Sequence, residues 1–133
     1  MIVGIGIDLC CISRIRRIVE QGPGHATRFA RRILHPTEWT DYQRRWVIRS
    51  QRPVPDDMVW FLASRWAVKE AAYKALYPQR KLTWKEVALV KSTGSPKPYL
   101  KIERAQECDG AGHSHVSLSH DGDWVVAQVI FEN

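Results

Sequence analysis

Cysteine is scarce in this sequence, and long hydrophobic runs are absent. Three cysteines occur in 133 residues, and two of them, Cys10 and Cys11, are adjacent. So few cysteines make a poor disulfide framework and favour a reducing, intracellular compartment over secretion. No apolar run reaches the roughly 18 residues that a membrane span needs, because Arg65 interrupts the longest candidate. The N-terminal stretch lacks basic residues and contains Asp8, so we expect neither a signal peptide nor a membrane span.

Lysine is missing from the first two-fifths of the chain. Residues 1–52 contain ten arginines, no lysine and four acidic residues, whereas residues 53–133 contain ten basic and ten acidic residues. The whole net charge of +6 therefore lies in the N-terminal part. The planar guanidinium group matches carboxylates and phosphates, so this distribution favours a docking surface for nucleic acid, a membrane surface or an acidic protein. A solvated face without a partner is the alternative that composition leaves open.

Length and patterning predict one α+β domain over residues 1–133. The composition, 44% hydrophobic and 26% charged, is that of a globular protein. The β-branched run at residues 1–8 predicts a strand, and Asp121-Gly122 predicts a hairpin between the last two strands. Further patterns predict helices at 12–20, 28–34, 37–49 and 58–77, the last capped by Asp57, then strands at 84–90, 99–103, 115–119 and 124–131. A strand, then helices, then several strands is an α+β order.

The first candidate functional residue is Asp8, at the end of the otherwise apolar first strand. Burying a carboxylate is unfavourable unless a metal ion or an arginine pairs with it. The alternative is that Asp8 caps the helix that follows. Gly4 and Gly6 lie within the same strand, where glycines often mark the close approach of a ligand or another backbone.

Glu70 and Lys74 form the second candidate, on the longest predicted helix. Their spacing places them on one face about one turn apart, and an ordinary surface ion pair is the alternative interpretation. Four alanines surround the pair, at positions 67, 71, 72 and 75, and we expect their small side chains to leave room for a ligand. A glutamate that completes a hard-cation site with Asp8, beside a lysine that holds phosphate, would make a phosphoryl-transfer centre.

The segment 115–121 contains serine, histidine and aspartate, but it is a weak candidate for a hydrolase triad. Its side chains alternate between the two faces of a strand, and no Gly-x-Ser-x-Gly elbow precedes them. A zinc site built from His113, His115 and His120 lacks the usual ligand spacing and a cysteine pair.

Four segments, in order along the chain, resemble the motifs of the holo-acyl-carrier-protein synthase family of 4′-phosphopantetheinyl transferases. They are residues 4–9 (GIGIDL), residues 28–34 (RFARRIL) followed by Glu38, residues 61–75 (FLASRWAVKEAAYKA), and residues 115–121 (HVSLSHD) with 127–130 (AQVI). The match begins at residue 1 and covers nearly the whole chain. It departs at residues 94–98, where the family usually has Gly-Lys-Pro, so we assign no adenine-binding residues.

The resemblance implies that the phosphopantetheine arm of coenzyme A moves to a serine of an acidic acyl carrier protein, releasing adenosine 3′,5′-bisphosphate. It implies a compact α+β fold, with an antiparallel sheet packed on helices, that assembles as a homotrimer with active sites at subunit interfaces. The implied cofactor is Mg²⁺, and neither nucleic acid nor a membrane is an expected partner. The tryptophan-rich helices resemble fungal stand-alone members that serve a mitochondrial carrier. We therefore expect the mitochondrial matrix, with the cytoplasm as the alternative.

Roles for individual residues also follow from the resemblance. Asp8 and Glu70 are expected to bind Mg²⁺, and Glu70, or a water that it orients, to accept the serine proton. Lys74 is expected to stabilise or protonate the leaving group. The residues expected to contact coenzyme A are Arg65, Lys69, Lys74 and His115. Those expected to dock the carrier protein are Arg14, Arg17, Arg28, Phe29 and Arg32, in agreement with the charge distribution.

Two other classes of function are compatible with part of the sequence. A nucleic-acid-binding module would also use an arginine-rich N-terminal half, but the aromatic residues there follow helical spacing and no recognition motif is present. An interaction protein that keeps this fold without catalysis would not need Asp8, Glu70 and Lys74 together, and all three are present.

Overall fold

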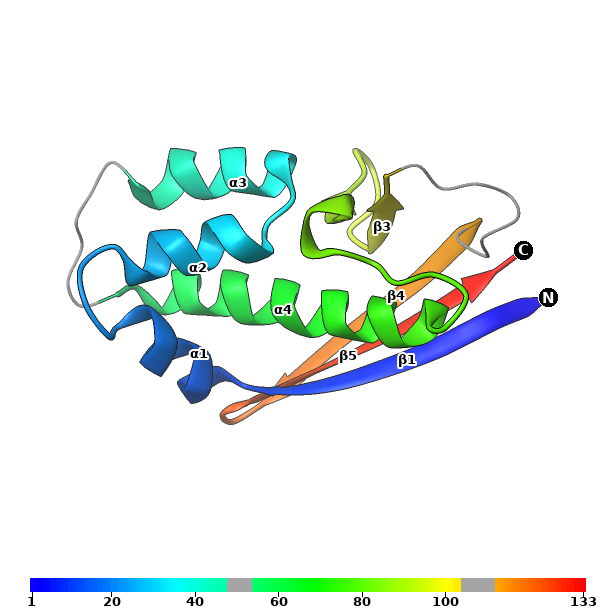
Figure 1. Ribbon diagram of the computed structural model, residues 1–133, viewed down its shortest axis with the longest axis horizontal. Coiled ribbons are helices and arrows are strands. Elements are labelled where there is room, and N and C mark those ends of the chain that lie inside the picture. The colour runs from blue at the N-terminus through cyan, green and yellow to red at the C-terminus, as the bar shows by residue number, and fades with distance from the viewer. Residues whose placement is uncertain (48–53, 104–111) are drawn as a thin grey trace.

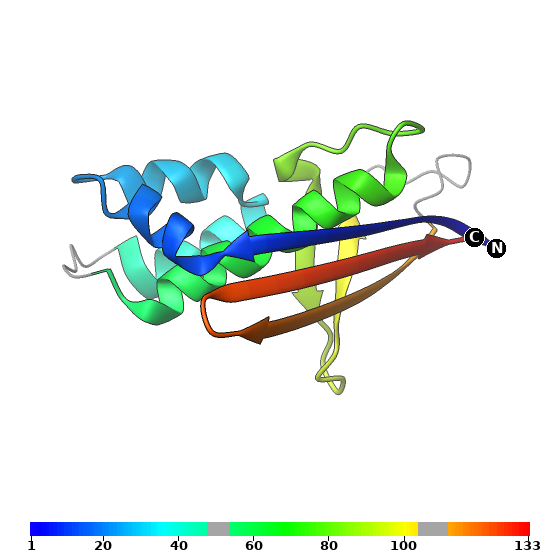
Figure 2. The same cartoon turned by 90° about the horizontal axis from the view of Figure 1, so that it is seen from below.

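The computed structural model describes residues 1–47, 54–103 and 112–133. Its main sheet is antiparallel, in the order β1-β5-β4, and is formed by β1 (Ile2–Cys11), β5 (Trp124–Glu132) and β4 (His113–Asp121). The longest helix, α4 (Asp56–Leu76), lies along one face of this sheet and packs mostly on β1 and β5 (Figures 1 and 2). The two chain ends meet at one end of the sheet, where the Met1 amino group donates to the Asn133 carbonyl oxygen.

Three short helices gather over the N-terminal half of α4 (Figure 1). They are α1 (Ile12–Val19), α2 (His25–Ile33) and α3 (Pro36–Tyr42), and α3 continues into a π-helical turn, η1 (Gln43–Val47). A second, two-stranded antiparallel sheet follows α4 and contains β2 (Val87–Lys91) and β3 (Pro98–Ile102), preceded by a 3-10 turn, η2 (Trp84–Glu86). Helices packed against antiparallel sheets confirm the predicted α+β class.

Helix α4 is the centre of the hydrophobic core. Apolar side chains on most of its circumference are buried, because the sheet covers one side and the short helices and β2 cover others. A helix that is apolar nearly all round is expected to be buried in this way. Within the described residues, no helix is long and apolar enough to cross a membrane.

The structure corrects several predicted element boundaries. The predicted strand at 84–90 begins only at Val87, because Thr83 and Glu86 form a capping box that starts a 3-10 turn at Trp84. Asp57 is not the cap of α4: Pro55 holds that position, and Asp57 lies in the first turn, where a carboxylate is favoured by the helix dipole. The predicted helix at 37–49 is α-helical only as far as Tyr42, and its residues 48 and 49 lie outside the described residues.

Candidate active site

Strand β1 and helix α4 touch backbone to backbone. A Cβ atom placed on Gly4 would lie 1.8 Å from the carbonyl oxygen of Ala75, and one on Gly6 would lie 1.8 Å from that of Ala71. The glycines predicted to mark a close approach therefore admit the backbone of α4. The alanines of α4 were expected to leave room for a ligand, but this is wrong: those at 67, 71 and 72 are fully buried, and Ala75 nearly so.

This close packing brings Asp8 and Lys74 together. The Lys74 ammonium lies 3.1 Å from Oδ1 of Asp8 and donates to the carbonyl oxygen of Ile7 at 2.9 Å. The Asp8 side chain is 14% exposed, so its carboxylate is largely removed from water and is paired with a cation. The alternative that Asp8 caps α1 is wrong, because Asp123 of the hairpin accepts the Ser13 N–H in the first turn of that helix.

Glu70 completes a pair of carboxylates on neighbouring elements. Its pKa is raised above the ordinary value because burial disfavours the charged form, and the negative charge of Asp8 raises the pKa further. Lys74, one turn along α4, opposes both effects. Two neighbouring carboxylates are a suitable donor set for a hard cation such as Mg²⁺. Among the described residues there is no group of three or more His, Cys, Asp or Glu that could hold a metal ion.

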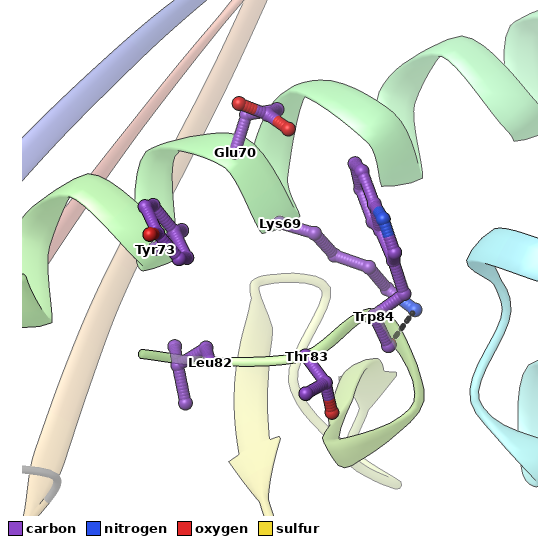
Figure 3. Close-up of a pocket in the computed structure, with 6 residues that line it drawn as sticks. All are labelled: Lys69, Glu70, Tyr73, Leu82, Thr83 and Trp84. Atoms are coloured by element: carbon purple, nitrogen blue, oxygen red, sulfur yellow. Dashed lines mark hydrogen bonds between the residues drawn. The ribbon is translucent and has the colours of Figure 1, made fainter. Parts of the chain in front are cut away.

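A cavity of about 180 Å³ opens beside Glu70. Figure 3 shows its lining residues, which come from α4 and from the segment that leads into η2: Lys69, Glu70, Tyr73, Leu82, Thr83 and Trp84. One carboxylate and several apolar or aromatic side chains are a typical lining for a small organic group. Neither Tyr73 nor Thr83 was expected in a site from the sequence, because they carry no charge and lie on different elements.

Lys69 lines this cavity, but its ammonium does not lie among the charges of the Asp8 site. The ammonium donates to the carbonyl oxygens of Ile33 and Trp84, at 2.7 and 3.1 Å, and to the carboxylate of Glu38. Figure 3 shows the hydrogen bond to Trp84. These three acceptors match its three protons, and the residue is 3% exposed. The structure does not bring this ammonium to the pair of carboxylates, although a phosphate contact was expected from the sequence.

Arg65 lines a larger cavity of about 800 Å³. This cavity is bordered by α3, η1 and α4 on one side and by the β2–β3 hairpin and β4 on the other. The Arg65 guanidinium stacks 3.8 Å from the centre of the Phe61 ring, and its buried Nε lacks a hydrogen-bond partner. Lys97 of the segment that departs from the family pattern lines the same cavity, as do Arg45 and Lys91. These four cations share the cavity with the carboxylates of Glu38, Asp41 and Asp57, so its lining is of mixed charge, and Arg65 Nε lies 3.7 Å from Oε2 of Glu38.

His115 is remote from Asp8 in this single chain. It pairs with Ile130 in the sheet, and Ile130 in turn pairs with Ile5, whose side chain is 58% exposed. Asp8 pairs with the fully buried Ala127, on the face that α4 covers. His115 is therefore on the outward face of the sheet, where its Nε2 lies 3.3 Å from the Glu132 carboxylate.

The residues expected to dock the carrier protein lie on α1 and α2. Arg14, Arg17, Arg28 and Arg32 are exposed, as a docking surface requires. Phe29 differs, because it is partly buried and its ring stacks on Trp66 of α4 with centroids 5.7 Å apart.

The role of Glu38 was not expected from the sequence, where this residue stands out only as part of a family motif. This carboxylate is 3% exposed and accepts from the backbone N–H groups of His35 and Leu89, at 3.0 and 3.1 Å, besides the Lys69 ammonium. The available signal was local: Glu38 stands three residues after His35 at a helix start, which is the spacing of a capping box.

Comparison with known proteins identifies the family. The sequence profile of the 4′-phosphopantetheinyl transferase superfamily matches residues 4–129. A holo-[acyl-carrier-protein] synthase of Nitratidesulfovibrio vulgaris is 41% identical over the full length of both chains. The mitochondrial 4′-phosphopantetheinyl transferase B of Aspergillus fumigatus is 35% identical, over 96% of this chain and 92% of its own. A crystal structure is known for a holo-(acyl-carrier-protein) synthase from Bacillus anthracis in complex with coenzyme A (3′,5′-ADP). Its sequence is 27% identical to this one, and the two structures superpose with a TM-score of 0.73 over 99% of this chain and 97% of that one.

The chain belongs to the 4′-phosphopantetheinyl transferase superfamily. Within it, the nearly full-length matches to holo-acyl-carrier-protein synthases confirm both the resemblance seen in the sequence and the expected class of enzyme.

Proposed function

We propose that this protein transfers the 4′-phosphopantetheine group of coenzyme A to a serine of an apo-acyl carrier protein and releases adenosine 3′,5′-bisphosphate. The observation that carries this proposal is the convergence of Asp8, Glu70 and Lys74 from β1 and α4 beside a cavity, in a member of this enzyme family. A carboxylate pair next to an ammonium supports phosphoryl transfer, because charge develops on the phosphate oxygens during that reaction.

The proposed chemistry joins the serine oxygen to the phosphorus that carries the pantetheine arm. The bond from that phosphorus to the bridging pyrophosphate oxygen breaks, and this oxygen leaves with the electron pair on adenosine 3′,5′-bisphosphate. Glu70 is the proposed acceptor of the serine proton, directly or through a water, and its raised pKa suits a general base. Lys74 is the proposed cation at the leaving phosphate.

Mg²⁺ is the proposed cofactor, held by Asp8 and Glu70. When bound, it would neutralise charge on the pyrophosphate. A site with two protein carboxylates suits Mg²⁺, which usually takes one or two carboxylates and completes its shell with water and substrate phosphates. The Lys74 ammonium donates to Oδ1 of Asp8, which places a cation beside this proposed ligand.

Coenzyme A is proposed to occupy the surface next to the cavity beside Glu70, with its phosphates near Lys74. Arg65 and the other cations of the larger cavity are proposed to receive anionic parts of the nucleotide. Lys69 is proposed to support the wall of the cavity through its hydrogen bond to the Trp84 carbonyl oxygen, and not to contact a phosphate directly.

A homotrimer with shared active sites is the proposed assembly. The outward face of β1 exposes Ile5, Ile7 and Leu9, each about 60% exposed, and Trp124 of β5 is 50% exposed. Exposed apolar surface of this kind is typical of an interface between subunits. Since His115 is on this same face, a second copy could place its own His115 at the Asp8 site.

The acidic carrier protein is proposed to dock on the exposed arginines of α1 and α2. The mitochondrial matrix is the proposed location, supported by the mitochondrial fungal relative, whereas the bacterial relatives support the cytoplasmic alternative. Imaging of a fluorescent fusion in the source cells distinguishes the two locations.

Incubation with coenzyme A, Mg²⁺ and an apo-acyl carrier protein tests the proposed reaction. We expect mass spectrometry to show a carrier heavier by one phosphopantetheine group, with the modified serine located by fragmentation. A carrier in which that serine is replaced by alanine is the control. An unmodified natural carrier after prolonged incubation with several carrier proteins would contradict the proposal.

A further inference from the structure

A buried ion pair lies on the side of α4 that faces the short helices. Its partners are Glu38 of α3 and Lys69 of α4, whose side chains are 4% and 2% exposed. The lysine immediately precedes Glu70, the proposed metal ligand, on the same helix.

The ammonium of Lys69 joins three elements that are separate along the chain. One acceptor is the carbonyl oxygen of Ile33, the last residue of α2, and another is that of Trp84 in η2. The third is Glu38. The last turn of an α-helix leaves carbonyl oxygens without helical partners, so Lys69 occupies one of these acceptors at the end of α2.

A row of aromatic rings follows the same route. Phe29 of α2 stacks on Trp66 of α4 with ring centroids 5.7 Å apart. The ring centroids of Trp66 and Trp84 of η2 are 4.7 Å apart. The side chain of Trp84 lines the cavity beside Glu70 (Figure 3). Two independent sets of contacts, one polar and one aromatic, thus run from α2 through α4 to the wall of this cavity.

We propose that Lys69 is a positioning residue, which fixes the carrier-docking helix α2 and the cavity wall at Trp84 relative to Glu70. This inference rests on the proposed function, because it assumes that a carrier docked on α2 presents its serine at Glu70. A misplacement of about 1 Å between reacting groups can reduce a rate by roughly 10²-fold. A rigid polar joint between the docking helix and the catalytic helix prevents such a misplacement.

Replacement of Lys69 by arginine and by methionine tests the proposal. Lys69→Arg keeps a positive charge opposite Glu38, but a planar guanidinium cannot occupy the same buried space and donate to both carbonyl oxygens in the same geometry. Lys69→Met removes the charge and all three hydrogen bonds. We expect kcat, with coenzyme A and carrier both saturating, to fall about tenfold or more in each variant, while KM for coenzyme A stays within about twofold.

Val59→Ala is the matched control. It removes buried volume from the same helix, about three turns before Glu70. All variants are assayed at a temperature at which circular dichroism shows them fully folded. We expect Val59→Ala to lower the melting temperature and to keep kcat near that of the wild type.

Each outcome decides between the roles. If the kcat of Lys69→Arg is as high as that of Val59→Ala, the ion pair only stabilises the fold, and the proposal is overturned. A KM for coenzyme A raised tenfold at constant kcat would instead make Lys69 a direct phosphate contact. If Lys69→Met does not fold, Lys69→Arg decides alone. Absence of transfer by the wild type would contradict the proposed function itself, which distinguishes that failure from failure of the positioning role.

Discussion

Asp8 and His115 lie on opposite faces of the same three-stranded sheet. Asp8 faces α4, whereas His115 faces outward beside Glu132. Side chains on opposite faces of a sheet cannot meet within one chain. If both belong to the proposed active site, each site must combine residues from two copies of the protein.

Mixing two inactive variants tests this arrangement. We expect Asp8→Asn and His115→Ala each to lose most transfer activity when assayed alone. Trimers assembled from an equal mixture should recover roughly a quarter of the wild-type activity, because in random assembly that fraction of interfaces pairs a natural Asp8 with a natural His115. The variants are unfolded and refolded together, with separately refolded samples as controls. A mixture no more active than its components would contradict a shared site.

Substitution of Gly6 by alanine should destabilise the protein strongly. The added methyl group would meet the backbone of Ala71, which cannot rotate away as a side chain could. We expect the free energy of unfolding to fall by about 3 kcal/mol, the upper part of the usual range for overpacking. Gly22→Ala is the control, because its added Cβ would make only ordinary contacts with His25, at 3.4 Å or more. Urea denaturation of both variants measures the difference, and equal losses would show that β1 can move away from α4.

Local patterns predicted the parts of the site that depend on one element, and failed for contacts between elements. The glycines of β1 and the spacing of Glu70 and Lys74 are visible in the sequence, as is the resemblance that assigned Asp8 to the same site. The pairing of Lys69 with Glu38 joins residues 31 positions apart, and only the packing of α3 on α4 decides it. The same holds for His115, whose remoteness from Asp8 depends on the register of β4 and β5.

The effect of Glu70→Gln on the melting temperature should change sign when Mg²⁺ is added. The pKa of Glu70 is raised in the folded protein, so its ionised form opposes folding at neutral pH and its protonation at lower pH relieves that cost. In EDTA at pH 7 we expect Glu70→Gln to melt above the wild type, with a smaller difference at pH 5. Mg²⁺ should stabilise the wild type and not the variant.

Transfer activity distinguishes the proposed metal site from a pair of carboxylates that only destabilises the fold. Glu70→Gln and Asp8→Asn should both abolish turnover at low Mg²⁺ while keeping the fold. Circular dichroism and light scattering provide the control for fold and assembly. If Mg²⁺ raises the melting temperatures of the wild type and of Glu70→Gln equally, the cation does not bind at Glu70.

Lys74→Ala should reduce kcat and move its pH dependence. As a fixed charge at the leaving phosphate, Lys74 would act mainly in the transition state, so we expect a loss of about 10²-fold or more in kcat with little change in coenzyme A affinity. Lys74 also lowers the pKa of Glu70. Its removal should therefore raise that pKa and shift the acidic limb of the kcat profile to higher pH.

Lys74→Arg is the matched variant, because it keeps the charge beside Asp8. We expect it to retain the acidic limb of the wild type even if kcat falls. A Lys74→Ala variant whose only defect is a raised KM for coenzyme A would make Lys74 a ground-state phosphate contact.

Charge reversal on α1 and α2 should impair use of the carrier protein. Arg14 and Arg28 are exposed on the two helices that hold most of the N-terminal arginines, and α1 begins four residues after Asp8. Charges at the rim of an interface mainly govern association rate and salt dependence. We expect Arg14→Glu, alone or with Arg28→Glu, to raise KM for the carrier at least tenfold and to flatten its dependence on salt.

The control for this prediction is Lys101→Glu, which reverses an exposed charge on β3, in the separate two-stranded sheet. Its carrier KM should stay close to that of the wild type, which excludes a general effect of net charge. Coenzyme A affinity, measured by calorimetry, should be unchanged in every variant, since none of Arg14, Arg28 and Lys101 is among the groups proposed to bind it. If Arg14→Glu and Lys101→Glu raise the carrier KM equally, the arginines act only through the net charge of the protein, and the carrier must dock on another surface.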